Sequence, residues 1–313
     1  MSKPVPPAPD PSAIGVIPKP PFARLPDPSG LFARRAARCR KLAAGHDLGP
    51  FLGFLAGLAE AQHAVGAGAG AGAGAGLGSP AMPTAETLER AERHAMPPLD
   101  RAGFRAGPET MALIDRLLAL VAEAEMPAAA RAAVERVTAA DDAARAEMAA
   151  NVLADAIPFE AVAEHALVAA ALQVQFAGLA AGLDAGRLKA VGDGVCPACG
   201  GPPSASLIVG WTPNPGVRYC SCSLCGTLWN YVRAKCTICG STSKISFREI
   251  EGGGGLVKAE LCGECHGYVK VMYQQQQPDL DPIADDVATL GLDLLVQDLG
   301  FRRGAVNPFL IGY

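Results

Sequence analysis

The fold of this 313-residue chain is decided by a cysteine block that opens with Cys196-Pro197-Ala198-Cys199 and continues to Cys222-Ser223-Leu224-Cys225. The block is then repeated as Cys236-Thr237-Ile238-Cys239 and Cys262-Gly263-Glu264-Cys265. Each pair is a CxxC motif, and adding 40 to the first four cysteine numbers gives the second four. This equal spacing indicates an internal duplication of one small module.

The chemistry of a bound metal ion accounts for this spacing. A tetrahedral site holds thiolate sulfurs about 2.3 Å from the ion, which places two sulfurs roughly 3.8 Å apart. A CxxC turn presents two sulfurs at that separation, and glycine leaves the turn cheaply because it adopts positive φ. Glycine follows three of the turns directly, and His266 intervenes in the fourth. The predicted ligands are Cys196, Cys199, Cys222 and Cys225 for one ion, and Cys236, Cys239, Cys262 and Cys265 for the other.

Cysteine usage also depends on the compartment. The chain begins Met1-Ser2-Lys3-Pro4 and continues proline-rich, with no apolar segment typical of a secretion signal. We therefore expect a cytoplasmic protein, in which thiols stay reduced. There, clustered cysteines indicate a metal site more often than a disulfide or a thioredoxin-like redox pair.

Other residues leave the ligand choice and the metal open. Cys220 could replace a ligand, but the 40-residue offset favours Cys222, so we expect Cys220 to be a free thiol. His266 could replace a sulfur, although four thiolates are already available. Cys39 is expected to be a small packing residue. Four thiolates suit zinc and also a mononuclear iron, and a closed site of this kind leaves no open position for hydrolysis.

The rest of the chain predicts an α+β protein in which an all-α domain precedes the cysteine block. Ten prolines in residues 1–28 predict an extended arm. A glycine- and alanine-rich segment at 66–80 predicts a low-complexity loop within the helical domain. The expected division is 1–28 for the arm, 29–187 for the helical domain, 188–233 and 234–275 for two tandem rubredoxin-like or zinc-ribbon-like modules, and 276–313 for a C-terminal helix and tail.

Hydrophobic periodicity predicts six helices within the helical domain. The first carries a dense set of basic residues, which we interpret as a solvated face; the alternative is a dock for an acidic partner surface. The basic residues are Arg34, Arg35, Arg38, Arg40 and Lys41, and the helices are expected at about 31–44, 48–65, 84–95, 109–124, 128–155 and 158–184.

A C-terminal helix is predicted where Asp281 offers an N-cap and Pro282 the first helical position. Gly300 is expected to end it. Asp285 and Asp286 stand in its first turn, where they either contact a partner or complement the helix dipole. We expect the helical domain or the cysteine modules to cover its apolar stripe, which consists of Ile283, Val287, Leu290 and Leu294.

Charge and composition exclude several classes of function. The net charge is −4, and residues 191–275 hold seven Lys and Arg against five Asp and Glu. Eight thiolates around two divalent ions make this region acidic, so we expect no nucleic-acid binding. The uncharged stretch 166–183 contains Gln173 and Gln175 and predicts a buried helix, so we expect no membrane insertion. The sequence shows no glycine-rich phosphate loop and no convincing nucleophile–base pair, so we do not expect an enzyme.

Beyond these patterns, the run RYCSCSLCGTLW at 218–229 resembles the formate dehydrogenase accessory protein FdhE family. The run CGECHGYVK at 262–270 and the tail signature at 284–290 with Asn307-Pro308-Phe309 are also similar to that family, as is 31–43. The Gly-Ala insert at 66–76 and Cys220 depart from it.

This resemblance implies a cytoplasmic, non-catalytic accessory protein needed for formation of active formate dehydrogenase. Such a chaperone-like protein binds the catalytic subunit before export and carries two rubredoxin-like sites with iron, zinc remaining an alternative. By carry-over, the eight CxxC cysteines are the ligands. The alternative function is a rubredoxin-like one-electron carrier. The sequence leaves a homodimer open.

Overall fold

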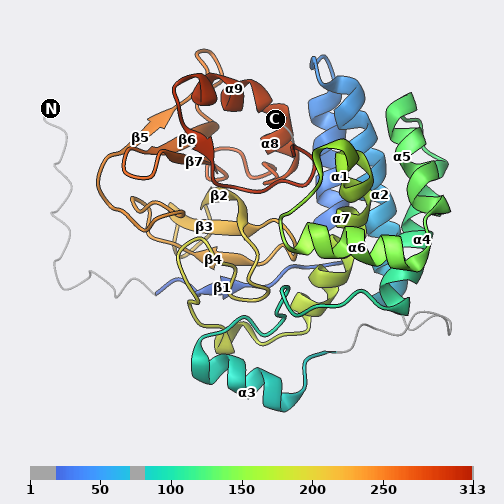
Figure 1. The fold of residues 1–313 in the computed structure, drawn as a ribbon. Helices are drawn as coiled ribbons and strands as arrows, with labels where there is room; N and C mark the ends of the chain where they lie inside the picture. The colour runs from blue at the N-terminus through green and yellow to red at the C-terminus, as the bar shows by residue number, and fades with distance from the viewer. Residues whose placement is uncertain (1–18, 71–81, 312–313) are drawn as a thin grey trace, which may run out of the picture.

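A computed structural model describes residues 19–70 and 82–311. Figure 1 shows a bundle of helices beside a mixed sheet, with α8 and α9 at one end of the sheet and α3 at the other. The predicted α+β class, with helices at both ends of two cysteine modules, is confirmed.

Four of the helices that precede the cysteine block pack around α7. Its residues are almost all apolar, and Val168, Leu172 and Phe176 are fully buried where α2, α4, α5 and α6 surround the helix. The bounds are α1 (Leu31–Ala43), α2 (Gly49–Gly70), α3 (Ala85–His94), α4 (Pro108–Ala122), α5 (Ala128–Ala139), α6 (Asp142–Leu153) and α7 (Val162–Ala181), with short 3₁₀ turns at Phe159–Ala161 and Ala185–Arg187.

α7 lies in the stretch predicted to be a buried helix. Phe159–Ala181 is long and apolar enough to cross a membrane by length and composition, but 78% of its most apolar window is buried inside the protein. Its two glutamines are satisfied internally, since Gln173 Nε2 donates to the Ser223 carbonyl at 2.8 Å and Gln175 Oε1 accepts from Thr110 at 3.1 Å. These features fit a core helix.

Helix boundaries differ from the prediction at three places. The single helix expected at 128–155 is two helices, because Asp141 caps α6 by accepting from Ala144 N at 2.8 Å. The low-complexity loop expected from residue 66 is wrong for 66–70, which continue α2; residues 71–80 of that prediction lie outside the described residues.

The expected C-terminal helix is also two: α8 (Ala284–Ala288) and α9 (Leu290–Asp298). They break at Thr289, whose hydroxyl donates to the Asp285 carbonyl at 2.7 Å. The predicted apolar stripe is wrong at Leu294, which is 50% exposed, because the break turns α9 so that Leu292 and Val296 face inward.

The strands of both cysteine modules form one continuous sheet. Its order is β1-β4-β3-β2-β7-β6-β5, with β8 added to β7. The two modules meet where β2 and β7 pair in parallel, with Ser206 opposite Val271 and Leu207 opposite Met272. The strands are β1 (Ala23–Arg24), β2 (Pro203–Val209), β3 (Val217–Cys222), β4 (Leu228–Asn230), β5 (Ile245–Arg248), β6 (Val257–Cys262), β7 (Gly267–Met272) and β8 (Arg302–Arg303).

The proline-rich N-terminal segment contributes to this sheet, which its composition did not predict. Ala23 pairs with Trp229, so β1 covers the outer edge of β4. Prolines flank β1, as is typical of a short edge strand. The predicted arm is therefore partly integrated into the fold.

The duplication is visible in the pairing registers. Ser221 lies opposite Leu228, and 40 residues later Leu261 lies opposite Tyr268. β3 and β4 of the first module thus correspond to β6 and β7 of the second. β2 corresponds to β5, although the β5–β6 register is offset by one residue from that of β2–β3.

Candidate metal centres

The four cysteines of the first set, which we call the first site, converge next to the helical bundle. Cys196 Sγ lies 3.7 Å from Cys225 Sγ, and Cys199 Sγ lies 3.4 Å from Cys222 Sγ. All four sulfurs lie within 4.8 Å of one another and all four residues are buried. These separations are close to the roughly 3.8 Å that a tetrahedral thiolate site requires, so the first site could hold one metal ion.

The second set, which we call the second site, has the same shape. Cys236 Sγ lies 3.8 Å from Cys265 Sγ, and Cys239 Sγ lies 3.7 Å from Cys262 Sγ. Its surroundings differ, because Cys239 is exposed and Cys265 is half-buried. The sequence spacing therefore produces two sites of similar geometry in different environments.

The turns that carry the cysteines supply hydrogen bonds to sulfur. Gly201 N donates to Cys199 Sγ, and Ile238 N donates to Cys236 Sγ, both at 3.4 Å. In the fourth turn, His266 itself adopts the left-handed conformation, at φ +53°, that glycine takes in the other three turns. Burial raises the pKa of Cys262, but hydrogen bonds from backbone N–H groups outweigh this effect and lower the pKa from its ordinary value of 9.0 to about 7.

An arginine from the helical region lies beside the first site. Arg101 N donates to the Cys199 carbonyl at 3.2 Å, which holds its loop against the first turn. A Cβ atom at Gly201 would lie 3.3 Å from the sulfurs of Cys199 and Cys222 and 3.4 Å from Arg101 Nη1. The guanidinium is thus separated from the sulfurs by one residue without a side chain. Four thiolates around a divalent ion would carry a net charge of −2, which this cation would partly balance.

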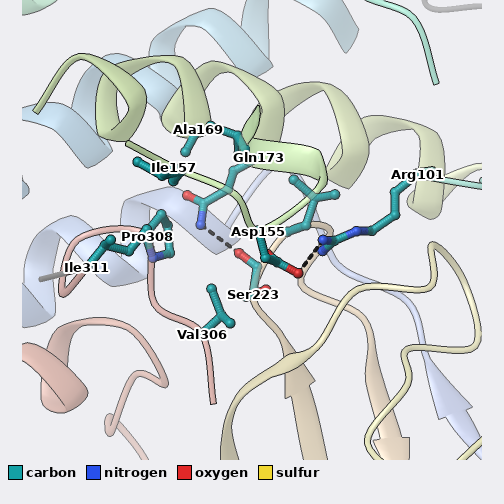
Figure 2. A pocket seen from close by; sticks show the side chains of 11 residues that line it. Arg101, Asp155, Ile157, Ala169, Gln173, Ser223, Val306, Pro308 and Ile311 are labelled. Carbon is teal, nitrogen blue, oxygen red and sulfur yellow. Dashed lines mark hydrogen bonds and ion pairs between the residues drawn. The ribbon is translucent and has the colours of Figure 1, made fainter. Parts of the chain in front are cut away.

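Figure 2 shows the small cavity next to Arg101. Its volume is about 160 Å³, and Asp155 pairs with Arg101 at its edge. On the other side, Gln173 donates to the carbonyl of Ser223, inside the second cysteine turn. The core helix α7 therefore contacts the Cys222–Cys225 turn of the first site directly.

The two cysteines outside the CxxC motifs do not join either set. Burial raises the pKa of Cys220 to about 11, and its sulfur lies 3.7 Å from the Ser206 hydroxyl. Cys39 is buried on α1, where burial raises its pKa to about 12. Both are protonated thiols at neutral pH.

The solvated face predicted for α1 holds for Arg34, Arg40 and Lys41, which are exposed, and is wrong for Arg35 and Arg38, which are buried. Arg38 donates from Nη2 and Nε to the carboxylate of Asp285, at 2.6 and 2.9 Å, and both side chains are buried. Arg35 Nε pairs with Asp281 at 3.4 Å. The acidic surface that α1 meets belongs to the chain's own C-terminal segment, which the sequence could not place beside it.

A second buried ion cluster contains Asp286, the acid next to Asp285 in the sequence. Lys270 Nζ lies 3.1 Å from Asp286 and 2.5 Å from Asp293, and Arg303 pairs with both. Burial raises the pKa of Asp286, but Lys270 and Arg303 outweigh it and lower the pKa below its ordinary value. Asp285 and Asp286 thus both lie in buried contacts within the fold, and neither is an exposed contact residue.

A third buried pair connects the two modules. Arg218 on β3 donates to both carboxylate oxygens of Glu260 on β6, at 2.9 and 3.0 Å, although β2 and β7 lie between these strands. The same guanidinium donates to the carbonyls of Val232, Arg233 and Lys235 in the connecting segment. No local pattern in the sequence indicates this pair.

Comparison with known proteins places the chain in one family along nearly all its length. Residues 20–193 match the family described as FdhE, N-terminal, 195–233 its central domain and 234–310 its C-terminal domain. A protein of Rhizobium meliloti (strain 1021) named Protein FdhE homolog is 44% identical over 307 residues, covering 97% of this chain and 98% of that protein. A homolog of the same name from Stutzerimonas stutzeri (strain A1501) is 38% identical over 93% of both chains.

A solved structure agrees with this assignment. The crystal structure of the FdhE protein from Pseudomonas aeruginosa superimposes with a TM-score of 0.79 at 32% sequence identity. The match covers 94% of this chain and 99% of that one. The helical bundle, the two cysteine modules and the C-terminal helices therefore occur together in a known relative, and the chain belongs to the FdhE family.

Proposed function

We propose that this chain is an accessory protein needed to form active formate dehydrogenase, and that it binds the catalytic subunit before export. The proposal rests on its membership of the FdhE family, which extends through the helical region, both modules and the C-terminal segment. It includes a cytoplasmic location, where an immature subunit is available.

The metal centres are part of this proposal. The eight CxxC cysteines bind two ions as thiolates, iron by family resemblance and zinc as the alternative. The sulfur separations in both sites support this assignment. Four thiolates leave no open coordination position, so neither site supplies a Lewis acid and the role is not catalytic.

The same proposal divides the chain into the arm at 1–28, the helical domain at 29–187, the modules at 188–233 and 234–275, and the C-terminal part at 276–313. The electron-carrier alternative is less favoured, because a carrier needs one redox-active iron and leaves the large helical region without a role.

Anaerobic purification followed by elemental analysis and an optical spectrum tests the metals. Two ions per chain are expected; far fewer than two would contradict the assignment.

The partner is tested by capture with purified components. The metal-loaded, tagged chain is mixed with the unassembled catalytic subunit of a formate dehydrogenase, and an unrelated tagged protein of similar charge is the control. We expect the subunit to be enriched only on the accessory chain. Equal recovery on both baits would contradict the proposed function.

A further inference from the structure

The junction between the modules shows how the β2 edge of the first module pairs with a strand from the second module. The outer edge of β2 binds β7 in parallel, and Leu207 lies opposite Met272. Each module has two outer edges, one formed by β2 or its counterpart β5 and the other by β4 or its counterpart β7. The junction joins the β2-type edge of the first module to the β4-type edge of the second. The β2-type edge of this module is thus one that accepts a parallel strand.

The corresponding edge of the second module is β5. Within residues 19–70 and 82–311, β5 pairs with β6 alone and ends the sheet. Phe247 lies opposite Glu260, in the position that Ser206 holds opposite Cys220, and it is 41% exposed. Proteins commonly protect such edges with prolines, bulges or several charges. β5 has no proline and one charge, Arg248.

Exposed apolar side chains continue from this edge toward α9. Ile250 is 39% exposed, and a side chain at Gly291 would contact its Cδ1 at 3.8 Å. Leu294 and Leu295 on α9 are 50% and 55% exposed. Figure 1 shows β5 and α9 at the same end of the molecule. Recognition of an added strand needs two components: a sheet edge that offers free backbone groups and a neighbouring apolar surface that contacts the side chains.

We propose that the β5 edge binds an extended apolar segment of an incompletely folded protein as an added parallel strand. This inference rests on the proposed function, in which that protein is the immature catalytic subunit. An unfolded chain offers both a free backbone and apolar side chains. A folded subunit withdraws both into its own sheet, so the accessory protein releases it when folding is complete.

A peptide titration tests the edge. The full-length, metal-loaded protein is titrated with a fluorescein-labelled peptide that copies Tyr268–Tyr273, from the strand that fills the corresponding edge of the first module. We expect Phe247→Lys to weaken binding by about tenfold or more, because burying a phenylalanine contributes about 1.5–3 kcal/mol and 1.4 kcal/mol is tenfold. Phe159→Lys is the matched control, since Phe159 is 79% exposed beside an apolar groove of the helical bundle.

Two N-methylated peptides test the backbone pairing without altering the protein. Each carries methyl groups on alternate amides, so one loses the hydrogen bonds to β5 and the other keeps them. We expect only one to lose binding. Equal binding of both, no effect of Phe247→Lys, or an equal effect of Phe159→Lys would overturn the proposal. A dimer of the free protein that Phe247→Lys dissociates would assign the edge to a second copy and would also overturn it.

Capture of the catalytic subunit separates this inference from the function on which it rests. Wild type is expected to capture the subunit and Phe247→Lys to recover at least about fivefold less, with unchanged metal content and circular dichroism. Equal capture by both proteins would refute the β5 edge while the accessory function stands. Capture by neither would refute the accessory function itself.

Discussion

The two metal sites have nearly the same sulfur geometry and very different neighbours. The first site lies in the main apolar cluster, which it shares with the helical bundle, and each of its four cysteines is at most 4% exposed. In the second site Cys239 is exposed and Cys265 half-buried. The 40-residue duplication therefore sets the arrangement of the sulfurs, whereas the packing around each copy differs. We expect the rest of the fold to depend more strongly on a metal in the first site than on one in the second.

The largest expected difference comes from removing one ligand at equivalent positions, Cys225→Ser and Cys265→Ser. A structural thiolate site contributes on the order of 10 kcal/mol, which is comparable to the whole stability of a domain. We expect Cys225→Ser to loosen both the helical bundle and the first module. We expect Cys265→Ser to disturb only β5, β6, β7 and α9. Hydrogen exchange of the metal-loaded variants measures the extent of each effect. Equally extensive exchange would show that the fold depends on the two sites to the same degree.

The next largest effect concerns the pair that connects the modules. Arg218→Met leaves Glu260 buried without its partner, and we expect a loss of about 3–5 kcal/mol in the free energy of unfolding. The double variant with Glu260→Met removes both charges and should recover most of that loss. Urea denaturation measures both. A double variant as unstable as the single one would show that the pair is not what couples the two modules.

Arg101 contributes to the difference between the two sites, because its guanidinium lies beside the first one. We expect Arg101→Gln to weaken metal binding there by about 10- to 100-fold, as is usual when a residue next to the ligands is changed. Lys244→Gln is the matched control in the second module, where Lys244 is largely exposed and pairs with Glu264. Competition with a chelator gives both affinities. Equal weakening by the two substitutions would contradict a specific role for Arg101.

Oxidation should separate the two sites in time. Hydrogen peroxide and two protons convert two thiolates to a disulfide and two waters, and Cys239, exposed and 3.7 Å from Cys262, is the most accessible starting point. We expect the second site to release its ion about tenfold faster than the first. Mass spectrometry of trapped thiols identifies the order. Simultaneous loss of both ions would show that burial does not protect the first site.

The smallest effect is a pH dependence at the contact between α1 and the C-terminal segment. A hydrogen bond from Lys41 lowers the pKa of Asp279 to about 2, below its ordinary value of 3.8. The unfolded chain therefore binds this proton more readily, so the stabilisation is complete above about pH 5 and is lost as the pH falls toward 2. Asp279 is 47% exposed, so we expect under about 1 kcal/mol. Asp279→Asn should reduce the loss of stability between pH 5 and 3.5; an unchanged slope would contradict the assignment.

The sequence predicted those features that depend on local pattern. The equal spacing of the CxxC motifs is enough to place eight cysteines in two sets, because each turn and each hairpin is a short-range structure. The helices α1, α2, α3, α4 and α7 begin and end within a few residues of their predicted bounds, α2 excepted at its end. Periodicity and proline positions determine these elements locally.

The features that the sequence did not predict depend on distant partners. Arg38 looked solvated because Asp285 lies 247 positions away, and Arg218 finds Glu260 only after the modules join edge to edge. The parallel pairing of β2 with β7 has no marker of its own in the sequence, where both strands read only as short buried segments. Exposure of the second site follows from the same arrangement, because the first site lies in the apolar cluster of the helical bundle and the second site does not.

The short strand β1 has a further consequence. The modules join head to tail, so the same kind of contact could add a further unit to the sheet. At the end of the first module the edge of β4, which a neighbouring chain's β5 would need for this extension, is occupied by Ala23 and Arg24. Two residues of the chain's own N-terminal segment thus cover the edge at which a further unit would have to add.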